Sequence, residues 1–293
     1  MSADFTFIGV PIDSVGRAGG TELGPAKLRA LGLAELVGGD TGDLDVQIRG
    51  DERDAVTGIL GSQDVLTTTT VIREATAAAL TSGERPFLVG GCCTELPGAL
   101  AAARDVLGRT GVAYLDGHLD LSDGNTSPTG EAADMPLSVA LGRGPAAWVG
   151  VCEGASARVE DVVPIGYRDP DEVPTLEQIA PELGPAFRPV SKDVVVSEGP
   201  TAVGERVAAD LGARAGRFWM HLDVDILGED EFPATDYLMP NGLDMDELVA
   251  LMRPLAASPA LIGVSIGCYN PEKDPDDRYG RALVEAFRDA LTS

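Results

Sequence analysis

Residues 112–121 constrain the fold of this chain more than any other stretch, because an apolar run stops abruptly there at three polar side chains. These are Asp116, His118 and Asp120, and the chain has only 2 histidines in all. Side chains spaced by two leave an extended backbone on the same side, so the three are predicted to converge on a cation at a strand end. A strand followed by a polar turn without a ligand is the alternative that this stretch alone leaves open.

Two further strand-like runs end in side chains that can bind metal. Residues 86–91 precede Cys92 and Cys93 at the opening of an alanine-rich helix. Residues 218–227 form an apolar run with polar side chains at a period of two: His221, Asp223 and Asp225. That period predicts all three on one strand face. Buried carboxylates are costly unless a cation or hydrogen-bond donors compensate them, although a solvent-facing strand end would also explain them.

The rest of the chain alternates between strand-like and helix-like segments. Further strands are expected at 5–10, 45–49, 162–168 and 261–266, and helices at 71–80, 134–141, 203–215, 243–252 and 282–291. Right-handed crossovers between such strands imply a mainly parallel sheet with helices on both faces. No linker or repeat interrupts the pattern, so residues 1–293 are expected to form one α/β domain.

The charge balance narrows the class of partner. The chain carries 47 acidic and 22 basic residues and a formal net charge of -25, which argues against nucleic acid and anionic membranes as partners. The first residues lack a secretory signal and no later run is long enough to span a membrane, so a cytoplasmic location is expected. Reduced thiols are expected for the 4 cysteines, since Cys92 and Cys93 are adjacent.

The polar strand ends occur within motifs that resemble those of the ureohydrolase family, the arginases and agmatinases. The resemblance covers almost the whole chain and four segments carry it: residues 19–29 (GGTELGPAKLR), residues 90–93 (GGCC, where the family has Gly-Gly-Asp-His), residues 116–120 (DGHLD), and Asp223-Val-Asp225 with the loops at 233–235 and 240–243. The resemblance implies a three-layer α/β/α fold, usually oligomeric, in which two Mn²⁺ ions hold a hydroxide that hydrolyses a guanidino or amidino C–N bond.

The same resemblance implies a metal ligand set. Asp116 and Asp223 would bridge the two cations, and His118 and Asp225 would complete one of them.

Asp120 and the residue at position 93 would complete the other cation site. That residue is normally histidine in the family and is Cys93 here. A thiolate favours zinc or iron over manganese, so this second site is expected to hold Zn²⁺ or Fe²⁺ or to be empty.

Three departures from the family pattern bear on the substrate. Cys92 replaces the aspartate before the histidine ligand, Ala133 falls where arginases carry a proton-shuttling histidine, and Cys268 replaces the glutamate that grips the guanidinium. Arginase itself is therefore disfavoured. The chain resembles most a divergent bacterial branch with cysteine at the first ligand position and a Thr-Gly-Glu-Ala-Ala-Asp loop, here residues 129–134, which includes a hydroxyarginine hydrolase.

The expected activity is therefore hydrolysis of a linear C–N bond in a guanidino, hydroxyguanidino, ureido or amidino compound. Glu131 or His221 would protonate the departing amine. The candidates for contact with this small-molecule substrate are Thr129, Glu131, Asp134, Asp236 and Cys268. Two alternatives remain: a cysteine-nucleophile amidohydrolase, and a degenerate family member that binds a small molecule or a partner without hydrolysis. A homo-oligomer is expected.

Overall fold

A single parallel sheet forms the centre of the molecule. The computed structural model describes residues 5–15 and 19–291, and within them the sheet has seven strands in the order β2-β1-β3-β7-β6-β4-β5. All neighbouring strands pair in parallel. The strands are β1 (Phe5–Val10), β2 (Gly38–Asp43), β3 (Arg85–Gly90), β4 (Gly111–Leu115), β5 (Val162–Ile165), β6 (Phe218–Asp223) and β7 (Leu261–Gly267).

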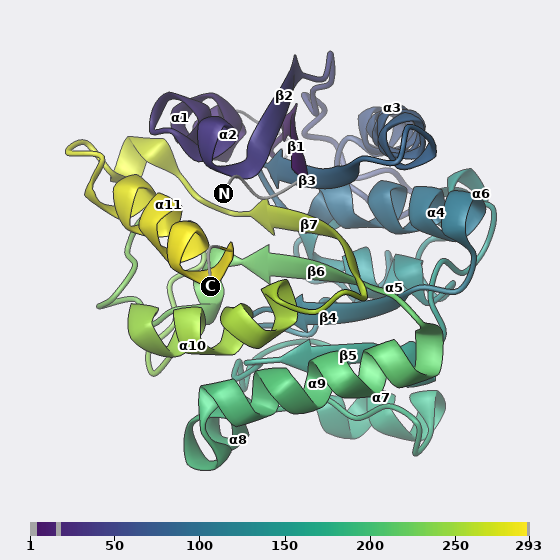
Figure 1. Ribbon diagram of the computed structural model, residues 1–293. Coiled ribbons are helices and arrows are strands. Elements are labelled where there is room, and N and C mark those ends of the chain that lie inside the picture. The colour runs from purple at the N-terminus through teal and green to yellow at the C-terminus, as the bar shows by residue number, and fades with distance from the viewer. Residues whose placement is uncertain (1–4, 16–18, 292–293) are drawn as a thin grey trace.

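Helices cover both faces of the sheet (Figure 1). One face packs against α1 (Gly24–Ala30), α2 (Leu33–Val37), α8 (Lys192–Glu198), α9 (Pro200–Ala215), α10 (Met245–Ala256) and α11 (Arg278–Leu291). The other packs against α3 (Ser62–Thr81), α4 (Leu96–Leu107), α5 (Pro136–Ala140), α6 (Ala146–Val151) and α7 (Leu176–Leu183). The predicted three-layer α/β/α class with a parallel sheet is confirmed.

The first edge strand lies outside the predicted range. Residues 45–49 were expected to form a strand, but the structure has no regular element there and pairs Gly38–Asp43 with β1 instead. This strand has the sequence GGDTGD and is largely exposed. An edge strand is held by backbone hydrogen bonds along one side and has little apolar surface to bury, so its sequence shows no apolar run.

The start of α11 depends on a buried carboxylate. Asp274 accepts hydrogen bonds from the hydroxyl of Tyr269 at 2.7 Å and from the backbone N–H of Gly280 at 2.8 Å. Burial alone would raise the pKa of Asp274, but these donors outweigh burial and lower it. The ionised carboxylate therefore stabilises the helix N-terminus, where the helix dipole also favours negative charge.

Asp274→Ala is expected to lower the free energy of unfolding at pH 7 by about 2 kcal/mol, because hydrogen bonds to a charged group are lost from a buried site. Since the folded-state pKa is lowered, this contribution is present above the unfolded pKa of about 4 and disappears as the pH falls through the folded value. Urea unfolding of both proteins at pH 7 and pH 3 measures it. Asp276→Ala, an exposed neighbour, is the control, and equal effects of the two variants would contradict the prediction.

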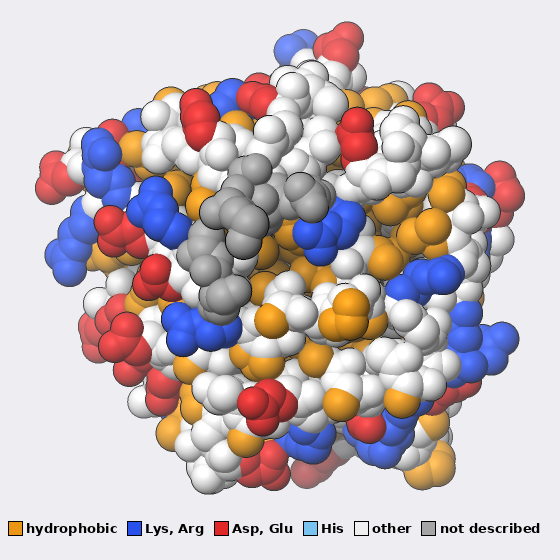
Figure 2. Space-filling view, in the orientation of Figure 1, with side chains coloured by type: hydrophobic (Ala, Val, Ile, Leu, Met, Phe, Trp, Pro, Cys, Tyr) orange, Lys and Arg blue, Asp and Glu red, His pale blue; other side chains and the backbone are white. Residues whose placement is uncertain are grey.

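Charged side chains are interspersed over the face that Figure 2 shows, with acidic and basic groups side by side around smaller apolar areas. The acidic side chains on this face are scattered and form no continuous patch. Among the described residues, no helix combines the length and the apolar character needed to cross a bilayer.

Candidate metal centre

The candidate side chains meet at the carboxyl edge of the sheet. β3, β7, β6 and β4 are neighbours in that order, and the segments at their ends carry Cys93, Cys268, Asp223 and Asp116. Because all the strands are parallel, their carboxyl ends lie along one edge, which is where α/β sheets place their sites. The convergence expected from the sequence is therefore present, although the local geometry differs from the expectation.

Asp116 and Asp223 end their strands through the same kind of hydrogen bond. The Oδ1 atom of Asp116 accepts the backbone N–H of His118 at 2.7 Å, and Oδ1 of Asp223 accepts that of Asp225 at 2.8 Å. An aspartate that bonds the N–H two residues on replaces the extended backbone with a turn. β6 accordingly stops at Asp223 and continues as a 3-10 turn, so the prediction of one strand face shared by residues 221, 223 and 225 is wrong for Asp225.

The same correction applies to Asp120. β4 ends at Leu115, and Asp120 has a left-handed backbone with a φ of 51°, so it does not leave a regular strand end. Its Oδ2 accepts the hydroxyl of Tyr114, and its N–H donates to Oε1 of Glu172 at 2.8 Å. The side chain still lines the central cavity, but hydrogen bonds from its neighbours hold it there.

Asp116, His118 and Asp225 form one group of donor atoms that all lie within 4.8 Å of one another. The Nδ1 atom of His118 is 3.0 Å from Oδ2 of Asp225 and 3.5 Å from Oδ1 of Asp116. The backbone N–H of Gly117 fixes the other oxygen of Asp225 at 3.1 Å. Two carboxylates and an imidazole suit manganese and similar divalent cations.

The ionisation of these groups shows how strongly they interact. Burial, then the Asp225 carboxylate, raises the pKa of Asp116 to about 6. Burial also raises the pKa of Asp120 and Asp223, with neighbouring carboxylates adding to the effect. Burial opposes protonation of His118, but Asp225 and Asp116 outweigh it and raise that pKa. A divalent cation among these oxygens would offset their mutual repulsion, so the donor set fits a metal.

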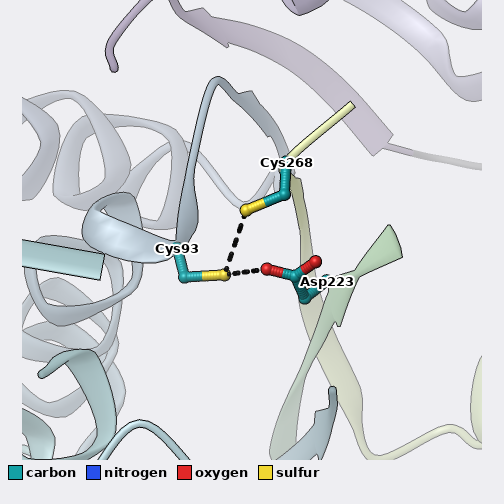
Figure 3. A group of neighbouring side chains, drawn as sticks. All are labelled: Cys93, Asp223 and Cys268. Carbon is teal, nitrogen blue, oxygen red and sulfur yellow. Dashed lines mark hydrogen bonds between the residues drawn. The ribbon is translucent and has the colours of Figure 1, made fainter. Parts of the chain in front are cut away.

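Cys93, Asp223 and Cys268 form a second group of donors (Figure 3). The Cys93 thiol donates to Oδ2 of Asp223 at 2.7 Å, and its sulfur is 3.8 Å from that of Cys268. Two glycines place Cys93: a Cβ on Gly90 would meet the Glu95 carboxylate at 2.0 Å, and a Cβ on Gly91 would meet the carbonyl oxygen of Ile12 at 1.6 Å. At Gly91 the close approach of two backbones requires glycine, whereas at Gly90 the atom met is a side-chain oxygen.

His221 lies beneath the carboxyl edge and is fully buried. Its Nδ1 is 2.7 Å from the hydroxyl of Ser265, and its ring stacks on Tyr114 with centroids 5.0 Å apart. Burial lowers the pKa of His221 to about 3, so the imidazole is neutral at pH 7. It does not line the cavity, and its donor atom instead groups with Cys93 and Asp116.

A cavity of about 170 Å³ opens above the donors. Its wall, as far as the described residues form it, contains seven acidic side chains and no lysine or arginine. Of the residues predicted from the sequence it includes Cys93, His118, Asp120, Thr129, Asp134, Asp223, Asp225 and Cys268. An acidic wall of this kind suits cations and cationic substrates.

The loop at 127–134 contributes through its own hydrogen bonds. Oδ2 of Asp134 accepts the hydroxyls of Ser127 at 2.5 Å and Thr129 at 2.6 Å. Asp134 was expected to cap a helix, but α5 begins at Pro136 with Met135 before it, because these hydroxyls take the Asp134 carboxylate. Glu131 lies behind the cavity wall and accepts the hydroxyl of Tyr237, which does line it.

Asp236 lies beside an adjacent cavity of about 1190 Å³ that shares His118 and Tyr237 with the first. Its carboxylate is 2.7 Å from Nζ of Lys273 and accepts a hydrogen bond from the side-chain N–H of Asn270 at 2.7 Å. The structure therefore does not bring Asp236 together with the donors, and its role stays a prediction.

The acidic loop after β5 was not predicted from the sequence to belong to the site. Asp169, Asp171 and Glu172 line the cavity, and Asp169 is 3.6 Å from Nε2 of His118. Burial raises the pKa of Glu172 to about 7. The signal was visible as a charged exit from a strand at 162–168, since an exit from a parallel strand reaches the same edge as the other ligands.

Fold and site together define a three-layer α/β/α protein with a carboxylate-rich cradle for divalent cations at the carboxyl ends of its strands. The sequence profile of the Arginase family matches residues 3–292. The chain belongs to that family, as its motifs indicated.

Individual relatives match most or all of the chain. Arginase of Bacillus subtilis (strain 168) is 26% identical over 302 residues, with 99% of this chain and 98% of the relative covered. The N(omega)-hydroxy-L-arginine amidinohydrolase of Streptomyces lavendulae is 26% identical over 209 residues, covering 71% and 69%. The structure of arginase from Bacillus caldovelox matches with a TM-score of 0.91 at 24% identity, over 100% of this chain and 99% of that one.

Proposed function

We propose that this protein is a metal-dependent hydrolase of a linear C–N bond in a guanidino, hydroxyguanidino, ureido or amidino compound. The observation that carries the proposal is the buried group of Asp116, His118 and Asp225 beside Asp223, in a chain of the arginase family. Two of the relatives are named as an arginase and as an N(omega)-hydroxy-L-arginine amidinohydrolase. Arginine therefore belongs among the substrates to test, although Ala133 and Cys268 replace two groups that arginases use.

Asp116, His118 and Asp225 would hold one divalent cation, for which we propose manganese, and Asp223 would share its carboxylate with a second. Bound cations of this kind lower the pKa of water and polarise the bond to be broken. The acidic cavity wall orients a cationic head group through Asp134 and Thr129, whose hydrogen bond fixes the loop. Cys268 lies at the cavity floor and would contact the same head group.

We propose that Glu131 takes up the proton that the attacking water loses and returns it to the departing amine by way of Tyr237, whose hydroxyl gives its own proton to the amine as it accepts the one from Glu131. The hydrogen bond between these two side chains connects Glu131 to the cavity. His221 is less suited to this role, because it is neutral and has no surface in the cavity. A cysteine nucleophile is also less suited, since burial raises the pKa of Cys93 and keeps it a thiol.

The experiment that tests the function is a substrate screen with defined metal content. Protein purified without chelator and loaded with Mn²⁺ is expected to release urea, ammonia or amine from at least one compound among guanidino, hydroxyguanidino, ureido and formimidoyl substrates. Chelation is expected to abolish the release, and added Mn²⁺ to restore it. A fully metal-loaded protein that hydrolyses none of them would support the degenerate alternative and overturn the proposal.

Glu131→Gln is expected to lower kcat/KM about 100-fold on the substrate found, because a positioned proton donor contributes 10²-fold or more. The bound metal, measured by mass spectrometry, is expected to stay unchanged, since Glu131 belongs to none of the donor groups. Glu285→Gln, which removes an exposed carboxylate on α11, is the control and leaves kcat/KM unaltered. Equal activity of the two variants would remove Glu131 from the mechanism.

Two finer expectations stay predictions. Size exclusion with light scattering would test whether the protein forms a homo-oligomer. Fractionation of the source cells would test the cytoplasmic location.

A further inference from the structure

Two cysteines from different strands face each other at the centre of the site. Cys93 follows β3 and is 1% exposed, and Cys268 follows β7, the strand hydrogen-bonded to β3. Their sulfur atoms are 3.8 Å apart, and that of Cys93 points toward the carboxylate of Asp223 (Figure 3). Both thiols are free.

The sulfur separation matches a shared metal ion. Two thiolates bound tetrahedrally to zinc at about 2.3 Å stand about 3.8 Å apart. The contact of Cys93 with Asp223, 2.7 Å here, is a thiol–carboxylate hydrogen bond. It opens when the thiol loses its proton, and the carboxylate oxygen then becomes available as a third ligand.

The backbone holds Cys268 in this position at a conformational cost. Its φ is 69°, in the left-handed region that non-glycine residues seldom occupy. The N–H of Cys268 donates to the carbonyl of Gly91 at 3.0 Å, which ties the end of β7 to the loop that carries Cys93. Strained backbone of this kind persists where the surrounding structure fixes a functional side chain.

A buried imidazole forms a separate donor group with Cys93 and Asp116. The Nε2 atom of His221 has no hydrogen-bond partner among the described residues, and the side chain is 0% exposed. The group that it forms with Cys93 and Asp116 has all donor atoms within 4.8 Å. Ser265 holds the opposite nitrogen, as a second hydrogen bond commonly does for histidines that bind metal.

Asp120, by contrast, joins none of the donor groups found among the described residues. The hydroxyl of Tyr114 holds its carboxylate, and the φ of 51° turns it away from a strand geometry. The family resemblance assigns Asp120 to the half of the site around Cys93, but its carboxylate is hydrogen-bonded to Tyr114. The donor atoms of Cys268 and His221 lie close to that of Cys93 instead.

We propose that Cys93, Cys268 and Asp223 form a thiolate site for zinc, so that the centre pairs a sulfur-bound cation with an oxygen-bound one. Each thiol gives its proton to solvent as its bond to zinc forms, and no electron is transferred. The inference rests on the proposed function only in that both concern one centre. Sulfur ligands select zinc over manganese, whereas the group of Asp116, His118 and Asp225 suits the harder cation.

Cobalt replaces zinc in such sites and makes the ligands visible. The reduced protein titrated with Co²⁺ in the presence of a phosphine reductant is expected to show a near-ultraviolet thiolate-to-cobalt band, and zinc is expected to displace it at about one equivalent per chain. In equimolar Zn²⁺ and Mn²⁺ the chain is expected to retain both, and mass spectrometry under native conditions counts them.

Two variants assign the thiolate ligands. Cys93→Ser and Cys268→Gly are each expected to lower the band to about one half, since one thiolate remains. Glycine is chosen because the backbone at position 268 favours it, so the fold is retained. Cys152→Ser, which changes a buried cysteine directly after α6 and outside the site, is the control and leaves band and affinity unchanged.

The outcomes separate this inference from the proposed function. Full band intensity in Cys268→Gly, or a cobalt protein without a thiolate band, overturns the zinc site while hydrolysis by the manganese protein still supports the function. A disulfide between Cys93 and Cys268 that forms in air despite saturating zinc overturns it as well. The expected bands without hydrolysis of any compound support the zinc site and refute the function.

Discussion

Asp223→Ala is expected to remove both metals and to lower kcat/KM by at least about 10³-fold, the largest effect among the single changes considered at the site. Asp223 contributes to both halves of the centre. Its Oδ2 faces the Cys93 sulfur at 2.7 Å, and its Oδ1 fixes the backbone N–H of Asp225 at 2.8 Å. Loss of the side chain therefore removes one ligand and releases the turn that positions another.

Metal content by mass spectrometry, kcat/KM and the thermal midpoint of the apo protein measure the effect. Without metal, the variant is expected to be at least as stable as the parent. Burial and the neighbouring carboxylates raise the pKa of Asp223, because the ionised side chain is unfavourable at this position, and the substitution removes that side chain. Asp210→Asn, which removes an exposed carboxylate on α9, controls for net charge. A folded Asp223→Ala protein with full metal occupancy would sink the assignment.

Gly91→Ala is expected to lower the free energy of unfolding by about 3 kcal/mol, the largest effect on stability predicted here. Its Cβ would lie 1.6 Å from the carbonyl oxygen of Ile12 and 3.1 Å from the N–H nitrogen of Glu22, both of them backbone atoms. Side-chain rotation cannot relieve such a collision, so the loop that carries Cys93 must move. Zinc affinity is expected to fall together with stability.

Gly150→Ala is the matched control. Gly150 lies within α6, and a Cβ there has nothing within 4 Å. The same substitution is expected to stabilise the protein by about 0.5 to 1 kcal/mol, because alanine loses less backbone entropy in a helix. Chemical denaturation of the two variants measures effects of opposite sign, and a Gly91→Ala protein as stable as the parent would contradict the packing argument.

The strands at the centre of the sheet were predictable from the sequence because they are buried on both faces. β3, β6 and β7 read as apolar runs, and the structure places them within a few residues of the expected ranges. β2 was not predictable, since a glycine-rich edge strand gains its place from the backbone of β1. Burial leaves a signature in the sequence, whereas edge pairing does not.

The sequence predicted which residues after strands β3, β4 and β6 lie together, but it predicted neither their local geometry nor the acidic loop after β5. Asp225 and Asp120 depart from the strand because side chains bond the backbone nearby, an effect that alternation alone does not encode. The position of Cys268 against Cys93 depends on β7 lying beside β3, although residues 93 and 268 are far apart in the chain. Sheet order of this kind depends on tertiary contacts.

The paired turns at Asp116 and Asp223 have a consequence for how this centre can change over evolution. Each aspartate commits one oxygen to an N–H only two residues away, so its aim is set by its own short segment. Cys93 and Cys268 follow separate strands and take no part in either turn. If the proposed zinc site forms, substitutions at 93 and 268 would change the preferred cation while the two aspartates keep their orientation, so that metal choice could change without a change of fold.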